Sequence, residues 1–153
     1  MRRYPTLEAF ERFETSDGFV MASQRGLVRV SVLGPQVVRL DLERHAHADF
    51  AEPTQEVLDR VAASGNGPLF MAVDAEGMTS YDSRFRYLWT EWLKRNINNI
   101  ECVSGLFRNG LIEAGVIVIN AVTGLNLIQR CRTRDDFEDR LDEAYQRARR
   151  SIA

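Results

Sequence analysis

Apolar and polar positions alternate in part along the first third of the chain. Residues 27–33 and 37–42 carry the β-branched and leucine side chains that are typical of strands with one buried face. A Gly-Pro pair separates the two segments, so they are predicted to form a hairpin. Residues 19–23 are predicted to form an earlier strand. Residues 6–14 are predicted to form a short amphipathic helix, with Leu7, Phe10 and Phe13 facing inward.

Beyond residue 50, apolar runs alternate with segments of helical periodicity. Residues 82–96 show that periodicity most clearly, with an inward face of Phe85, Leu88, Trp89, Trp92 and Leu93. Strands that alternate with helices form parallel crossovers, so the chain is predicted to be an α/β protein with a mixed β-sheet flanked by helices, opening with a β-hairpin. The remaining predicted helices are residues 53–63, 111 to near 124, and 134–151, and the remaining strands are residues 69–73, 100–107 and 125–131.

The junction at residues 69–83 is the most informative part of the pattern. A buried strand is predicted to run into an acidic, glycine-containing loop, after which a helix begins at Asp82-Ser83. Either residue can cap the helix, which is worth about 1 kcal/mol. Asp74, Glu76 and Asp82 could hold a hard cation, but their spacing lacks the ligand ladder of a calcium loop, so a solvated loop is predicted. The junction therefore indicates a recognition surface rather than an enzyme.

Composition narrows the class of protein. The 153 residues are 44% hydrophobic and 27% charged, which fits one domain with a sizeable core. The net charge of −2 gives no general attraction to nucleic acid. Cys102 and Cys131 lie in apolar segments and are predicted to be reduced core residues. The longest apolar run, residues 114–119, is too short for a membrane span, and no signal-like segment opens the chain, so a cytoplasmic protein is expected.

The two histidines, His45 and His47, are the strongest hint of a metal. In an extended segment, alternate residues lie on one side, which suits metal ligation. Only Asp49 is an evident third ligand, so a surface loop is favoured, and neither a metal nor a cofactor is predicted. The absence of any other histidine also argues against Ser-His-Asp or Cys-His catalysis, and no catalytic residue is assigned.

The order of elements and the junction together resemble the STAS fold of anti-sigma factor antagonists. That family has an apolar strand ending in Asp, a short loop, and Asp-Ser at a helix start, which correspond here to residues 69–74, 75–81 and Asp82-Ser83. The chain also looks like a divergent STAS-like group whose members are mostly of unknown function. A later family pattern of strand, turn, apolar helix, glycine and last strand corresponds to residues 101–107, 108–110, 111–122, Gly124 and 125–131.

The resemblance covers about residues 19–150 and carries implications for organisation and function. It implies a single STAS-like domain over residues 1–153, with an N-terminal extension at 1–17 and a core at 18–151. In partner-switching members, a partner kinase phosphorylates the Ser after this Asp, and the phosphorylated domain releases that kinase. The resemblance implies that phosphorylation of Ser83 switches partner binding. It also implies that the partner is a kinase-like anti-sigma factor or another signalling protein.

This chain departs from the family pattern immediately after Ser83. The family usually has small residues and glycine there, whereas this sequence has Arg84-Phe85-Arg86. A bulky basic pair can block the docking of a kinase, or it can pair with a different, acidic partner. Phosphate at Ser83 would add about two negative charges at a helix N-terminus.

The predicted function is a non-enzymatic regulatory domain that binds a protein partner, with neither nucleic acid nor membrane as a target. Arg108-Asn109 could hold an anion at the next helix start, although a turn followed by a cap is the simpler interpretation. The predicted contact residues around the switch Ser83 are Asp74, Glu76, Thr79, Ser80, Tyr81, Asp82, Arg84, Arg86, Tyr87, Arg108 and Asn109.

The apolar helix at residues 111–122 leads to two alternatives. Its second face, around Ile117 and Val118, is either buried beneath residues 1–14 or exposed for a partner or a homodimer. An exposed face favours an adaptor or localisation protein without phosphorylation. An apolar cavity beneath this helix would instead favour a domain that binds a small apolar ligand or lipid.

Overall fold

Seven strands form one mixed sheet in sequence order. The structure is a computed structural model that describes residues 9–65, 67–124 and 126–151. The first four strands pair antiparallel, and β4 to β7 pair parallel. The prediction of a mixed α/β sheet that opens with a hairpin is confirmed. The strands are β1 (Glu11–Glu14), β2 (Gly18–Ala22), β3 (Gly26–Gly34), β4 (Val37–Ala46), β5 (Leu69–Tyr81), β6 (Ile100–Leu106) and β7 (Ile128–Arg130).

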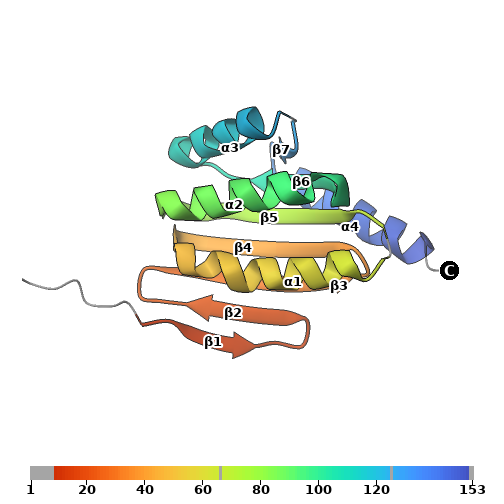
Figure 1. The fold of residues 1–153 in the computed structure, drawn as a ribbon, viewed down its shortest axis with the longest axis horizontal. Coiled ribbons are helices and arrows are strands. Elements are labelled where there is room, and N and C mark those ends of the chain that lie inside the picture. The colour runs from red at the N-terminus through yellow and green to blue at the C-terminus, as the bar shows by residue number, and fades with distance from the viewer. Residues whose placement is uncertain (1–8, 66, 125, 152–153) are drawn as a thin grey trace, which may run out of the picture.

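Four helices cover the two faces of the sheet unequally (Figure 1). Three lie over one face, and the fourth packs alone on the other. Short 3-10 turns at Ala48–Phe50 and Ile97–Asn99 precede α1 and β6. The helices are α1 (Ala51–Ala63), α2 (Ser83–Asn96), α3 (Gly110–Thr123) and α4 (Arg134–Ser151).

Alternation along β5 divides the core in two. Leu69, Met71 and Ala75 face α1, α2 and α3, whereas Phe70 and Ala72 face α4. The helical stripe predicted for residues 82–96 is confirmed in its main members, because Trp89, Trp92 and Leu93 are buried. Because α4 covers its face alone, the apolar side chains of that helix carry the packing there. They are Phe137, Leu141, Ala144 and Ala148.

The structure corrects the N-terminal prediction. Residues 11–14 form β1, which pairs antiparallel with β2, so the helix predicted at residues 6–14 is wrong over its described part. Phe13 is 55% exposed rather than inward, while Phe10 packs against the larger core; Leu7 lies outside the described residues. Part of the predicted extension at residues 1–17 is therefore an edge strand of the sheet.

The predicted loop at residues 75–81 is also wrong. β5 continues through it to Tyr81 because β4 extends alongside, with Glu43 opposite Gly77 and Ala46 opposite Tyr81. The last strand is shorter than predicted, at Ile128–Arg130, whereas α4 matches its predicted bounds. Within the described residues, no helix combines the length and apolar character needed to cross a membrane.

Candidate functional site

The carboxyl ends of β4 and β5 meet at one edge of the sheet, beside the start of α2. Ala46 pairs with Tyr81 at the end of the two strands, and the Asp82 N–H donates to the Ala46 carbonyl at 3.0 Å. In open α/β sheets, ligands commonly bind outside the carboxyl ends of the strands. At this edge, the side chains at the end of β4 and just after it therefore lie close to those at the end of β5 and the start of α2.

His45 joins Ser80 to Asp82 in a continuous chain of hydrogen bonds. Its Nδ1 lies 2.7 Å from Ser80 Oγ, and its Nε2 lies 2.8 Å from Asp82 Oδ1. The residue is buried at the end of β4, so the prediction of a surface loop is wrong for His45. The pairing of β4 with β5 shifts register between Arg44 and His45, where Arg44 has a φ of 60°, and such a bulge re-aims the side chain that follows.

The Ser80–His45–Asp82 chain has the composition of a hydrolase triad but the opposite imidazole orientation. In a triad, Nε2 faces the serine and Nδ1 faces the carboxylate. Here Nδ1 faces Ser80 and Nε2 faces Asp82. The arrangement fixes the orientation of the imidazole but does not match that catalytic geometry.

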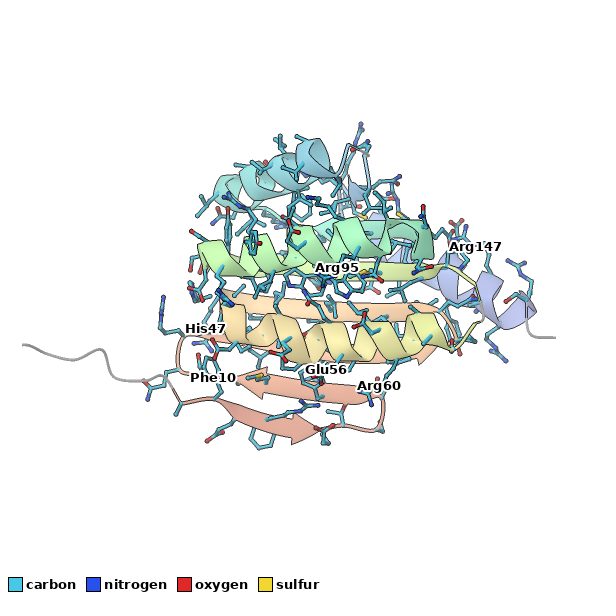
Figure 2. The ribbon with its side chains drawn as sticks, in the orientation of Figure 1. Phe10, His47, Glu56, Arg60, Arg95 and Arg147 are labelled. Atoms are coloured by element: carbon cyan, nitrogen blue, oxygen red, sulfur yellow. The ribbon has the colours of Figure 1, made fainter. Side chains whose placement is uncertain are left out.

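His47 lies beside His45 in an aromatic setting. The two rings are 4.7 Å apart between centroids, and Phe10 and Phe50 each stand edge-on to His47 at 5.1 Å. Figure 2 labels Phe10 and His47 near the end of the sheet where α1 begins. His47 Nε2 lies 2.8 Å from Ser23 Oγ, and the residue is 4% exposed. The surface-loop prediction is therefore wrong for His47 as well.

Asp82 stands at the cap position of α2 but does not cap the helix with its side chain. Its Oδ1 faces His45, and its Oδ2 accepts the Ala48 N–H at 2.8 Å, so the predicted side-chain cap is wrong for this residue. Burial opposes ionisation of the carboxyl group. The hydrogen bonds from Ala48 and His45 and the charge of both imidazoles outweigh that burial, and the pKa of Asp82 lies below its ordinary value.

Ser83 begins α2 and is exposed to solvent. Arg84 is exposed beside it, and Tyr87 is 60% exposed one turn further along, as predicted for the polar face. No hydrogen bond from the Ser83 hydroxyl to another described residue is present, so the hydroxyl is accessible for modification. The structure leaves the phosphorylation of Ser83 a prediction.

Two acidic residues of the junction, Asp74 and Glu76, lie on the α4 face of β5. Asp74 is 9% exposed and pairs with Arg39 at 3.2 Å and with Arg134 at 2.9 Å. Glu76 pairs with Arg134 at 3.0 Å and with Arg108 at 3.5 Å. These carboxylates connect the sheet to α4, so the predicted solvated acidic loop is replaced by an ion-pair network.

Asp41 of β4 extends this network beside Asp74. Burial raises the pKa of the Asp41 carboxyl group, although the hydrogen bond and the charge of Arg39 oppose that rise. The Asp41 carboxyl group is therefore a partly buried member of the ion-pair network rather than a free surface charge.

The turn before α3 behaves as a helix cap. Asn109 Oδ1 accepts the Leu111 N–H at 2.9 Å, which confirms the turn-and-cap interpretation, and its Nδ2 donates to the Thr79 carbonyl at 3.4 Å. Arg108 and Thr79 are exposed on either side of this contact. The turn is therefore fixed to the end of β5, next to the start of α2.

The outer face of α3 is exposed and apolar. Ile117 is 68% exposed and Val118 is 41% exposed, and the described part of the N-terminal segment pairs with the far edge of the sheet instead of covering them. The single charged residue of α3 is Glu113, which pairs with Arg130 at 2.7 Å. This face, completed by Leu111 and Val122, remains a predicted contact surface for a partner or a homodimer.

The inner face of α3 roofs an apolar cavity of about 120 Å³. Helix α2, the sheet, and Phe50 and Thr54 from the segment where α1 begins form its other walls, and its lining is almost entirely apolar. Trp89 lines the cavity, and its buried indole Nε1 has no hydrogen-bond acceptor among the described residues. The sequence predicted Trp89 as a core residue but gave no sign of this unpaired N–H. The α3 residues in the lining are Ile112, Gly115, Val116 and Ile119.

Comparison with known proteins supports the fold alone. No protein-family model matches the chain. No curated protein matches it either. A solved structure of an uncharacterized protein of the DUF3478 family from Shewanella loihica PV-4, described as having a SpoIIAA-like fold, is similar with a TM-score of 0.55. The match has 12% sequence identity and covers 92% of this chain and 99% of that one. A SpoIIAA-like fold is the STAS fold, so the resemblance of the sequence extends to the architecture.

Proposed function

We propose that this domain binds a small amphiphilic ligand in the cavity beneath α3, without catalysing a reaction. The observation that carries the proposal is an apolar cavity whose lining residue Trp89 has a buried, unpaired indole N–H. The cavity is comparable in size to an engineered cavity of about 150 Å³ that binds benzene. The ligand would therefore have a short apolar body and one hydrogen-bond acceptor.

The energetics favour occupancy. At about 24 cal/mol per Å³, a cavity of this size costs the folded protein on the order of 3 kcal/mol when it is empty. A buried donor without a partner costs about 1–3 kcal/mol more. A ligand that fills the space and accepts the Trp89 N–H would recover part of both costs.

Arg86 favours an anionic head group on this ligand. Arg86 is among the residues that line the cavity, and no ion pair joins it to another described residue. Tyr81 and Phe85, which precede Arg86 in the sequence, also line the cavity. A short-chain carboxylate matches this combination, with its chain among the apolar residues and its head near Arg86.

The test uses the two tryptophans as a built-in comparison. Trp92 Nε1 already donates to Asp59 at 2.9 Å, whereas Trp89 Nε1 lacks an acceptor. Titration with hexanoate, with hexanol as the neutral counterpart, is expected to move the indole N–H resonance of Trp89 and leave that of Trp92 in place. A Trp89→Phe variant assigns the two signals.

A matched pair of variants on α3 ties the effect to the cavity. Val116 lines the cavity, while Val118 on the same helix is 41% exposed outside it. Val116→Phe is expected to weaken hexanoate binding about tenfold or more, equivalent to about 1.4 kcal/mol, whereas Val118→Phe leaves it unchanged. A Trp89 signal that stays fixed in the wild type, or equal binding by both variants, would reject the proposal.

The exposed hydroxyl of Ser83 favours a second candidate function, the regulated binding of a protein partner. Phosphate there would lie at the N-terminus of α2, beside Arg84. In a pull-down from the native host, the Ser83→Ala variant is expected to retain a partner that the Ser83→Asp variant loses, with phosphate mapped to Ser83. Ser16→Asp, at another exposed serine, is the control. Identical partners for both Ser83 variants and no phosphate would leave Ser83 as the first residue of a helix.

A further inference from the structure

One ligating atom from each of His45, His47 and Asp82 falls within 4.8 Å of the other two. These residues come from the end of β4, the segment after it, and the start of α2. They include both histidines of the chain. Two imidazoles and one carboxylate with an open fourth position are the protein ligands of many zinc sites and of related first-row transition-metal sites.

We propose that His45, His47 and Asp82 bind a divalent transition-metal ion of the zinc type. In a tetrahedral site with bonds of about 2.0–2.1 Å, the ligating atoms stand about 3.3 Å apart. His45 Nε2 and Asp82 Oδ1 are 2.8 Å apart, and the ligating atoms of all three residues lie within 4.8 Å of one another, so small side-chain adjustments separate the present arrangement from a tetrahedral site.

The contacts behind the ligands strengthen the assignment. Metal-bound histidines usually direct their second ring nitrogen to another polar group, and bound carboxylates are held in a similar way. His45 Nδ1 faces Ser80 Oγ at 2.7 Å, and Asp82 Oδ2 accepts the Ala48 N–H at 2.8 Å. His47 Nε2 faces Ser23 Oγ at 2.8 Å. Each of the three side chains is therefore oriented by a neighbour.

Charge and burial also favour a cation at this place. Asp82 forms an ion pair with the His45 imidazole, which is itself one of the proposed ligands. Phe10 and Phe50 shield His47 from water on one side. An apolar wall behind partly desolvated ligands strengthens their interaction with a bound ion.

The site is independent of the cavity proposed above. The metal would use His45, His47 and Asp82, none of which lines that cavity. An ion held there would join the end of β4 to the start of α2. Metal binding can therefore be tested whether or not the cavity takes an amphiphile.

The first test uses tag-free protein freed of metal by a chelator. One equivalent of Zn²⁺ is expected to shift the imidazole resonances of both histidines in the NMR spectrum and to saturate at one ion per chain. Co²⁺ is expected to give the visible absorption of a four-coordinate site with nitrogen and oxygen ligands. Histidine signals that do not move, or a cobalt–thiolate band that identifies Cys102 or Cys131 as the ligand, would overturn the proposal.

Variants then assign the ligands. Asp82→Asn and His47→Gln are each expected to weaken Zn²⁺ binding by tenfold or more, measured by calorimetry on protein shown to be folded by circular dichroism. Asp49→Asn removes a nearby exposed carboxylate and is expected to bind as the wild type does. Ser80→Ala, which removes only an orienting contact, is expected to lose about tenfold in affinity. Wild-type affinity in Asp82→Asn would overturn the proposal. If a ligand variant fails to fold, the histidine resonances of the wild type decide.

Discussion

Replacement of Phe137 by alanine is expected to lower the free energy of unfolding by about 3–5 kcal/mol. Phe137 is fully buried in the core between α4 and the sheet, together with Phe70 and Leu106. The guanidinium of Arg39 also lies 5.3 Å from the centre of its ring. No other helix covers this face, so few neighbouring side chains can move into the cavity that the alanine leaves. The loss of unfolding free energy should therefore lie in the upper part of this range. Urea denaturation followed by circular dichroism measures the loss.

Phe13 provides the matched control for this prediction. It carries the same side chain on β1 but is 55% exposed, so Phe13→Ala should change the free energy of unfolding by no more than about 0.5 kcal/mol. The dependence of the free energy on urea should stay unchanged for both variants, since the fold is kept. Equal and small losses for the two variants would contradict the packing of α4 on this face.

The elements that the sequence predicts best are helices whose apolar residues recur at the spacing of their buried face. Residues 134–151 repeat apolar side chains with helical spacing, and α4 has those bounds. The stripe in residues 82–96 likewise forms the buried face of α2. In both cases, local spacing and tertiary packing require the same conformation.

The elements that sequence predicts poorly depend on a distant strand. Phe10 and Phe13 have a spacing that fits one face of a helix, but β2 pairs with residues 11–14 and makes them a strand. Gly77 and the polar residues around it look like a loop, yet β4 extends far enough to pair with them. Neither partner is evident from the local pattern.

The candidate sites were only partly visible for the same reason. The spacing of His45 and His47 places them together, but the third member, Asp82, is 37 residues from His45 in sequence. The sequence could not predict whether a cavity exists beneath α3. A cavity depends on how the side chains of α2, α3 and the sheet pack together. Local sequence does not encode that fit.

Three consecutive residues at the junction between β5 and α2 face three different surroundings. Tyr81 lines the cavity, Asp82 contacts His45, and Ser83 is exposed to solvent. The proposed ligand, metal ion and phosphate would therefore each contact a different one of these three neighbouring residues.

Gly26→Ala is expected to destabilise the protein by about 3 kcal/mol or more, the upper part of the range for overpacking. A Cβ at Gly26 would lie 1.8 Å from the carbonyl oxygen of His45. That oxygen belongs to the backbone of β4, so the collision can be relieved only by moving the strand. Displacement of the strand would also disturb His45, and the imidazole resonances of that residue should shift together with the loss of stability.

Gly77→Ala separates this clash from the general effect of adding a methyl group within a strand. The nearest heavy atom to a Cβ at Gly77 is 3.5 Å away, an ordinary van der Waals distance, and the residue is exposed on β5. Its free energy of unfolding should therefore remain within about 0.5 kcal/mol of the wild type. If Gly26→Ala were as stable as Gly77→Ala, with unchanged His45 resonances, the close approach of β3 to the bulge at Arg44 would be wrong. The orientation of His45 toward Asp82 would then lose its structural basis.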